Sequence, residues 1–178
     1  MFNKITWIIL FAGTLAMVYV MRETGKTLKT GTTPKGILDL EFAHNSEKVE
    51  AVLNAWSVKG DTGSAIDDAK RNTYFDFIFL LFYSSFLYCS CILLGRSGSI
   101  PTIKKLSVFF AIAALLAGLL DIMENIGMLQ SLDGKVSDSI AIFTTFCAGI
   151  KWTLVILVIL FLLTGLIAIV SRKLRTTR

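Results

Sequence analysis

The sequence has few of the residues from which metal and redox centres are built. It contains one histidine, His44, and three cysteines among 178 residues. A single histidine excludes bis-histidine haem sites and the histidine-rich sites that hold zinc or a pair of iron ions. Three cysteines are too few for a disulfide framework, so we expect them to be small buried apolar residues. We therefore predict no cofactor and no metal centre.

The sequence also lacks the short motifs of common enzymes. It has no glycine-rich phosphate loop, no Gly-x-Ser-x-Gly nucleophile turn and no protein-kinase signature. The serines within its apolar segments have no histidine there to activate them. These absences argue against an enzyme, although an intramembrane catalyst that uses a carboxyl group as acid or base stays open as the weakest alternative.

Apolar residues are abundant, at 54% of the chain with a mean hydropathy of +0.67. They form four blocks, at about residues 5–21, 74–94, 106–128 and 140–170. Each block is long enough to cross hydrocarbon about 30 Å thick, which takes roughly 17–25 helical residues. Only helices satisfy every backbone group within one such segment. We predict an all-α membrane protein, in which residues 1–178 form a single bundle of four transmembrane helices.

The first block allows a second interpretation, because Lys4 followed by an apolar run also fits a cleaved signal peptide. The end of the block, Tyr19-Val20-Met21, offers no small residues for a cleavage site. We therefore expect an uncleaved helix.

The distribution of basic residues predicts the orientation. The N-terminus, the turn Gly95–Lys105 and the tail Ser171–Arg178 together hold eight basic residues and no acidic one. Four crossings place these three segments on one side of the membrane, and basic segments collect in the cytoplasm. We predict a multi-pass protein of the cell (inner) membrane with both termini cytoplasmic. The net charge of +5 reflects this topology and does not indicate nucleic acid as a partner.

The predicted extracytoplasmic loop, residues 22–72, has some structure of its own. Leu38–Phe42 alternates apolar and polar residues, which predicts an extended piece. Asn45 or Ser46 can cap a helix that runs to about Trp56. The apolar face of this amphipathic helix comprises Val49, Val52, Leu53 and Trp56. We expect it to cover the outer end of the bundle, with Trp56 at headgroup level, either as a lid over a pocket or as packing cover.

Four charged side chains lie inside the apolar blocks: Asp76, Asp121, Glu124 and Lys151. A charge at bilayer depth is costly, so it normally faces the bundle interior and marks a functional site. Counted from the inner ends of their helices, Asp76, Glu124 and Lys151 lie at one height, roughly 27–28 Å from the inner boundary. Asp121 lies one turn deeper. We predict a single polar site in the outer leaflet, beneath the loop.

The third block presents a face of small residues that allows close helix packing. They recur at four-residue spacings and comprise Ala113, Ala114, Ala117 and Gly118. Asp121, Glu124 and Asn125 continue the same face. The bundle is therefore expected to pack tightly in its inner half and to open into a polar pocket below the loop.

The charge balance of the site predicts what it does. Three carboxyl groups face one lysine, so at least one should carry a proton or be neutralised by a bound cation or by Arg22. Such a carboxyl group suits a proton relay, a general acid or an amine-binding site. A metal site made of carboxylates and Asn125 is disfavoured by the adjacent Lys151. The alternative is a structural network that only sets the register of the helices.

Five strings stand out in the chain, in this order: TTPKGILDLEFA (Thr32–Ala43), AVLNAW (Ala51–Trp56), DFIFLLFYSSF (Asp76–Phe86), LLDIMENIGML (Leu119–Leu129) and CAGIKW (Cys147–Trp152). Together they resemble a group of small uncharacterised bacterial four-helix integral membrane proteins whose function is unassigned. The resemblance implies a bacterial inner-membrane location and the same four-helix layout. Trp152 departs from the pattern, since phenylalanine is expected there. The positions of interest it implies are Glu41, Trp56, Asp76, Asp121, Glu124, Asn125 and Lys151.

We expect a protein that binds a small amphipathic or cationic ligand, a lipid headgroup or a proton. The predicted binding residues are Asp76, Asp121, Glu124, Asn125 and Lys151, with Glu41 and Trp56 as lid residues. The alternative is a structural or assembly subunit of a larger membrane complex. The expected partners are the lipid bilayer, a lipid or small molecule, and either further copies of the chain or the other subunits of a complex.

Overall fold

The computed structural model describes residues 4–57, 64–97 and 100–176, and every regular element in these ranges is a helix. The four long helices are α1 (Lys4–Thr24), α4 (Ala65–Ser97), α5 (Pro101–Leu132) and α6 (Asp138–Thr176). Each of them is long and apolar enough to cross a membrane. The predictions of an all-α protein and of four membrane helices are therefore confirmed, and the chain is a multi-pass membrane protein.

The long helices extend beyond the predicted apolar blocks. α4 begins at Ala65 instead of Tyr74, and α1 continues to Thr24. The loop predicted at residues 22–72 is shortened at both ends as a result. Hydropathy marks only the stretch that sits in hydrocarbon, whereas a helix continues into the polar region as long as its backbone bonds are made. Asp67 and Asp68 in the first turn of α4 favour this longer helix, because acidic groups stabilise a helix N-terminus.

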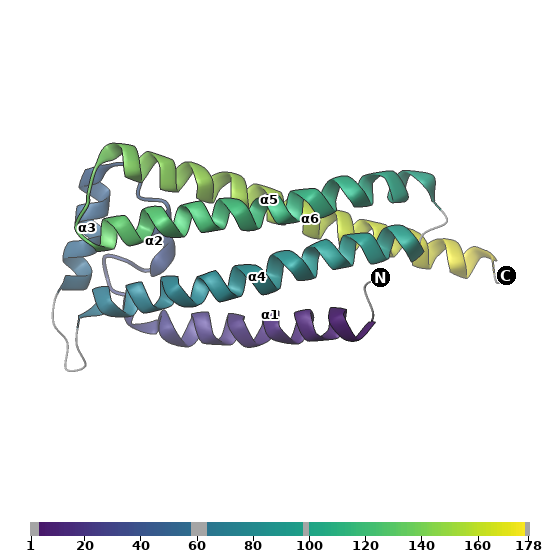
Figure 1. Cartoon of the computed structure of the whole chain (residues 1–178), viewed down its shortest axis with the longest axis horizontal. Helices are drawn as coiled ribbons and strands as arrows, with labels where there is room; N and C mark the ends of the chain where they lie inside the picture. The colour runs from purple at the N-terminus through teal and green to yellow at the C-terminus, as the bar shows by residue number, and fades with distance from the viewer. Residues whose placement is uncertain (1–3, 58–63, 98–99, 177–178) are drawn as a thin grey trace.

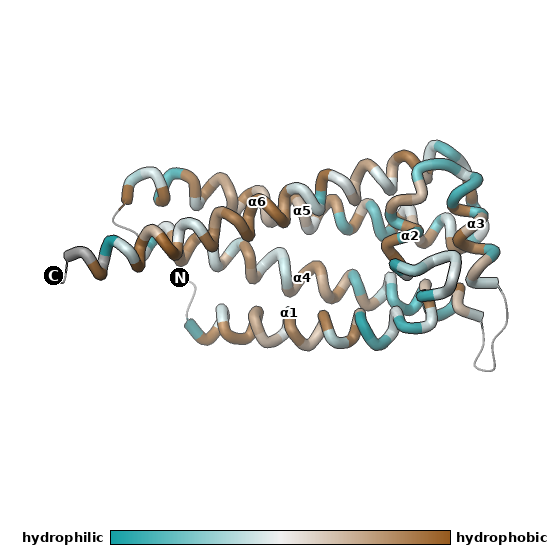
Figure 2. Tube along the Cα trace, turned by 180° about the vertical axis from the view of Figure 1, so that it is seen from behind, coloured by the Kyte–Doolittle hydropathy of each residue, from teal (hydrophilic) through white to brown (hydrophobic). Residues whose placement is uncertain are grey.

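The long helices run side by side in the order α1, α4, α5, α6, so that α4 packs between α1 and α5, and α5 packs between α4 and α6. Three short helices gather at one end of this bundle: η1 (Lys26–Leu28), α2 (Ile37–Glu41) and α3 (Ser46–Ser57) (Figure 1). We call these three helices and the turns between them the cap. Hydrophilic residues concentrate at the cap end, whereas hydrophobic residues predominate along the long helices (Figure 2).

Small residues bring α4 and α5 close together, as their spacing predicts. Ala114 and Ala117 are fully buried in this interface. A Cβ atom added to Gly118 would lie 2.9 Å from Ser84 Cβ on α4, which is too close for an ordinary contact. Glycine is therefore needed at Gly118 so that the two backbones can approach each other.

The cap has its own apolar core, and Trp56 lies at its centre. The indole is fully buried, and its Nε1 donates hydrogen bonds to Leu28 O at 3.0 Å and Thr33 Oγ1 at 3.1 Å. Val49 and Val52 are buried in the same core, so the predicted apolar face of α3 is correct. Trp56 points into the cap instead of outward to the lipid headgroups, because the buried Leu28 carbonyl group satisfies its N–H.

Two local predictions for the cap have opposite outcomes. The helix expected from Asn45 to about Trp56 is present as α3, and Asn45 Oδ1 accepts a hydrogen bond from Lys48 N at 2.9 Å. The extended piece expected at Leu38–Phe42 is wrong, since the helix α2 occupies it. Gly36 turns the chain into α2 with a φ of 66°, and Asp39 accepts a hydrogen bond from Lys35 N. Five alternating residues are too few to overcome this local turn geometry.

Replacing Gly118 with valine should destabilise the bundle by roughly 1–3 kcal/mol, because the added carbon atoms collide with Ser84 and push α4 away from α5. The measurement is the midpoint of thermal unfolding in detergent. Gly149→Val is the matched control, because nothing lies within 4 Å of a Cβ atom at Gly149. Equal losses in the two variants would contradict the close packing at Gly118.

Candidate functional site

Lys151 of α6 lies at the centre of the intramembrane charges. Its Nζ is 3.0 Å from Asp121 Oδ1 and 2.8 Å from Glu124 Oε2, both on α5. Asp121 and Glu124 are three residues apart, so they share one face of α5. The three residues are only 6%, 3% and 0% exposed, respectively. The structure therefore brings together three of the predicted site residues in one buried ion-pair cluster.

Glu41 adds a fourth charge from the cap. Its Oε2 lies 3.7 Å from Lys151 Nζ and accepts a hydrogen bond from Trp152 Nε1 at 3.1 Å. The backbone carbonyl of Glu41 accepts a further hydrogen bond from Thr145 Oγ1. The cap is thus fastened to α6 directly over the cluster. Trp56, the other predicted lid residue, does not reach the cluster, because it lies in the core of the cap.

The remaining predicted residues form a second pair next to the first cluster. Asn125 Nδ2 donates a hydrogen bond to Asp76 Oδ2 at 2.7 Å, joining α5 to α4. Tyr83, also on α4, donates a hydrogen bond to Asp121 Oδ2 at 2.7 Å. Tyr83 was not among the predicted site residues, although it lies seven positions after Asp76 and so on the same face of α4. The seven-residue spacing from Asp76 is the sequence feature that could have identified Tyr83 as a site residue.

The carboxyl groups of the site outnumber its cations. Lys151 is shared by Glu41, Asp121 and Glu124, while Asp76 has no basic side chain within ion-pair distance in the described part of the chain. Arg22, the alternative cation, is exposed to the outside of the bundle. Four carboxylates around one lysine are costly to bury in full ionisation. The excess of carboxyl groups over cations is therefore larger than the sequence predicts, because Glu41 also contacts Lys151.

The acidic side chains of the site surround the ammonium group of a lysine. No group of three or more histidine, cysteine or acidic side chains is arranged to hold a metal ion within the residues that the structure describes. The ammonium group of Lys151 stands among the acidic oxygens of Asp121 and Glu124, at the distances of ordinary ion pairs.

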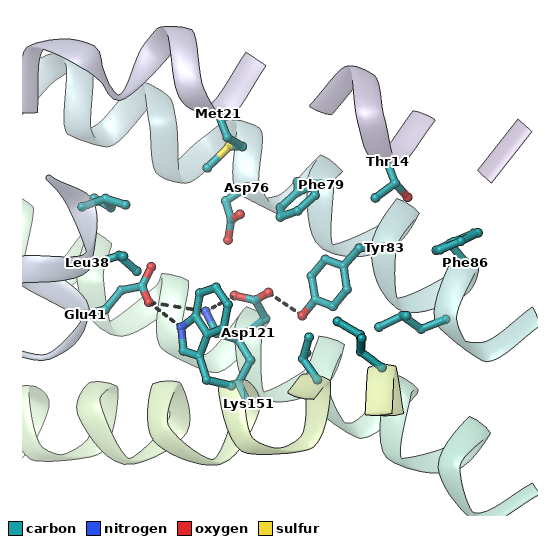
Figure 3. A pocket seen from close by; sticks show the side chains of 15 residues that line it. Thr14, Met21, Leu38, Glu41, Asp76, Phe79, Tyr83, Phe86, Asp121 and Lys151 are labelled. Atoms are coloured by element: carbon teal, nitrogen blue, oxygen red, sulfur yellow. Dashed lines mark hydrogen bonds and ion pairs between the residues drawn. The ribbon is translucent and has the colours of Figure 1, made fainter. Parts of the chain in front are cut away.

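A cavity of about 410 Å³ adjoins the cluster (Figure 3). This volume lies in the range of roughly 300–1,000 Å³ that is usual for small-molecule sites. One end of the cavity is polar, and its walls are otherwise mostly apolar or aromatic. The polar end comprises Glu41, Asp76, Asp121 and Lys151, whereas the walls include Met21, Phe79, Tyr83, Phe86, Leu87, Val155 and Ile159. Glu124 and Asn125 lie behind the lining.

The cavity lies between α1 and α6, and residues of α4 line its inner side (Figure 3). Thr14 and Met21 line it from α1, while Trp152 and Ile159 line it from α6. Trp152 and Ile159 are 40% and 42% exposed, so the rim of the cavity reaches the outer surface of the bundle. The neighbouring exposed side chains of α6, such as Ile156 and Leu160, are apolar, so the opening lies on the apolar side of the bundle.

No protein-family model, curated protein or solved structure matches this chain. The resemblance to small bacterial four-helix membrane proteins rests on the sequence strings alone and stays a prediction. The fold and the site together define a multi-pass membrane protein with a buried carboxylate–lysine cluster beside a lateral cavity. Function is inferred from that geometry.

Replacing Lys151 with methionine should destabilise the protein by about 3–5 kcal/mol, because three buried carboxylates lose their counter-charge. A second change, Glu124→Gln, should recover part of this loss by removing one of those carboxylates. Thermal unfolding in detergent measures both effects.

The control for Lys151→Met is Lys26→Met, which breaks the exposed Lys26–Glu23 pair. Surface pairs contribute about 0–1 kcal/mol, so this variant should unfold close to the wild type. A Lys151→Met variant as stable as the Lys26→Met variant would contradict the structural importance of the cluster.

Proposed function

We propose that this protein binds a small amphipathic molecule in the cavity between α1 and α6. The proposal rests on the separation of polar and apolar residues in the cavity wall. Its polar end holds the carboxyl groups of Glu41, Asp76 and Asp121, and the remaining wall is mostly apolar. A molecule with one polar end and one apolar end satisfies both parts, whereas water alone leaves the apolar wall without a partner.

The positions of the polar and apolar ends of the cavity relative to the cap support the same conclusion. α4 and α6 both run away from the cap, so Asp76 and Lys151 lie nearer the cap than Leu87 and Ile159 do. A lipid-like molecule in a bilayer leaflet has its polar group near the surface and its tail towards the middle. The cavity offers its polar and apolar parts in that same order.

We further propose that the protein lies in a bacterial inner membrane, with both termini cytoplasmic and the cap on the outer side. The support is the excess of basic residues at the end opposite the cap, including Lys4, Arg96, Lys104 and Lys105. With this orientation, the cavity opens into the outer leaflet.

The orientation can be tested by labelling single cysteines in intact cells with a membrane-impermeant maleimide. The three natural cysteines are buried, and they are replaced first. A cysteine at the exposed position Glu50 of the cap should be labelled, whereas one at the exposed position Thr102, in the first turn of α5, should react only after lysis. The reverse pattern would contradict the proposed topology.

The binding function can be tested by native mass spectrometry of the protein extracted with its lipids. The wild type should retain a small molecule, and Val155→Trp should lose it, because the indole fills the cavity. Leu157→Trp is the control, since Leu157 lies on the exposed face of the same helix. Identical bound molecules in both variants would contradict the cavity as the binding site.

A second outcome would favour the alternative function. If purification in mild detergent yields a stoichiometric partner chain and an empty cavity, the protein acts as an assembly subunit of a larger complex. The charged cluster would then serve to hold α5, α6 and the cap in register.

A further inference from the structure

The lysine at the polar end of the cavity is already engaged by carboxylates. Lys151 Nζ donates hydrogen bonds to Asp121 Oδ1 at 3.0 Å and to Glu124 Oε1 at 2.9 Å, and the carboxylate of Glu41 lies 3.7 Å away. A phosphate or carboxylate that approached Lys151 would have to compete with these three carboxylates. It would also meet the acidic oxygens of Glu41 and Asp121 in the lining. The cavity therefore opposes negatively charged headgroups.

Asp76 differs from the other carboxylates of the site. Its one hydrogen bond among the described residues comes from Asn125 Nδ2, which is a neutral donor. A carboxylate has room for about four donors, so Asp76 retains unused acceptor positions. Its side chain points into the cavity, towards the space beside Asp121 (Figure 3). Asp76 is therefore a carboxylate of the lining that has no ion-pair partner within the described part of the chain.

Aromatic rings stand next to this carboxylate. Phe79 and Tyr83 are in contact, with ring centroids 5.1 Å apart, and both line the cavity. Aromatic faces attract cations within about 6 Å of their centroids. The Tyr83 hydroxyl donates its proton to Asp121, so its oxygen can still accept a hydrogen bond from a ligand N–H group. The surroundings of Asp76 thus favour a positive charge from more than one side.

We propose that the molecule bound in the cavity is a cationic amphipath, a protonated amine with a single apolar tail, and that Asp76 is its counter-ion. The ammonium group donates to the unused acceptor positions of Asp76, and the tail lies along Leu87, Val155 and Ile159. This inference rests on the proposed binding function and narrows it to one charge class. Anionic amphipaths are disfavoured, because the carboxylates of Glu41, Asp76 and Asp121 line the polar end of the cavity.

The test compares three probes of equal chain length, dodecylamine, dodecan-1-ol and dodecanoate, on protein in phosphatidylcholine nanodiscs. Binding is measured as the rise in unfolding temperature over a concentration series, with Val155→Trp as the background for effects on the bilayer. Dodecylamine should bind the wild type at least about tenfold more tightly than dodecan-1-ol, as expected for one buried charge pair. Dodecanoate should give no rise above the background.

The counter-ion is tested with Asp76→Asn, which keeps the shape of the side chain and an acceptor for Asn125. In this variant, dodecylamine should bind no more tightly than dodecan-1-ol. Asp133→Asn is the matched control. Asp133 forms an ion pair with Lys70, 2.6 Å apart, and it is not part of the cavity lining. This control should keep the full preference for the amine.

The outcomes separate the two proposals. If dodecan-1-ol or dodecanoate binds as tightly as the amine, the cationic class is wrong while the binding function stands. If Asp76→Asn keeps the preference for the amine, Asp76 is not the counter-ion and the inference is overturned. If no probe exceeds the Val155→Trp background, both proposals fail. The wild-type comparison decides the charge class even if Asp76→Asn does not fold.

Discussion

The contact of Lys151 with Asp121 and Glu124 is the interaction on which the rest of the structure depends. A lysine or a carboxylate at this depth is costly when it lacks a partner, and truncating one member of a buried pair costs several kcal/mol. α5 and α6 therefore have one favourable register, the one that brings these groups within 3.0 Å of each other. Glu41 extends the constraint to the cap, which is held over the same lysine.

These ion pairs leave more carboxylates than cations in the site, and this excess of acidic groups determines the chemistry of the site. Lys151 pairs with three carboxylates, and Asp76 is not one of them. Asp76 is held in place by Asn125 and faces a cavity that is otherwise mostly apolar. A network whose only purpose was to set helix register would gain nothing from a carboxylate directed at an open cavity. We therefore assign the setting of helix register to Lys151, Asp121 and Glu124, and propose that Asp76 serves ligand binding.

The lateral opening follows from the way α1 is attached. α1 packs along α4, where Trp7 Nε1 donates to Ser90 Oγ at 2.9 Å and Asn72 Nδ2 donates to Met21 O at 3.0 Å. α6 packs on the other side of the bundle, against α5. The inner side of the space between α1 and α6 is lined mainly by α4, together with Asp121 of α5.

The sequence by itself determined the helical class, the four spans, the amphipathic α3 and the small-residue face of α5. These features depend on hydropathy and on periodicity within one segment, which the chain order contains. The common height of the charges also followed from counting along each helix. Tertiary structure decided that Trp56 lies inside the cap, that the carboxylate of Glu41 reaches Lys151 and that the Tyr83 hydroxyl bonds Asp121. Each of these depends on contacts between segments far apart in the chain, and the cavity exists only because those contacts hold α1 and α6 on opposite sides of α4.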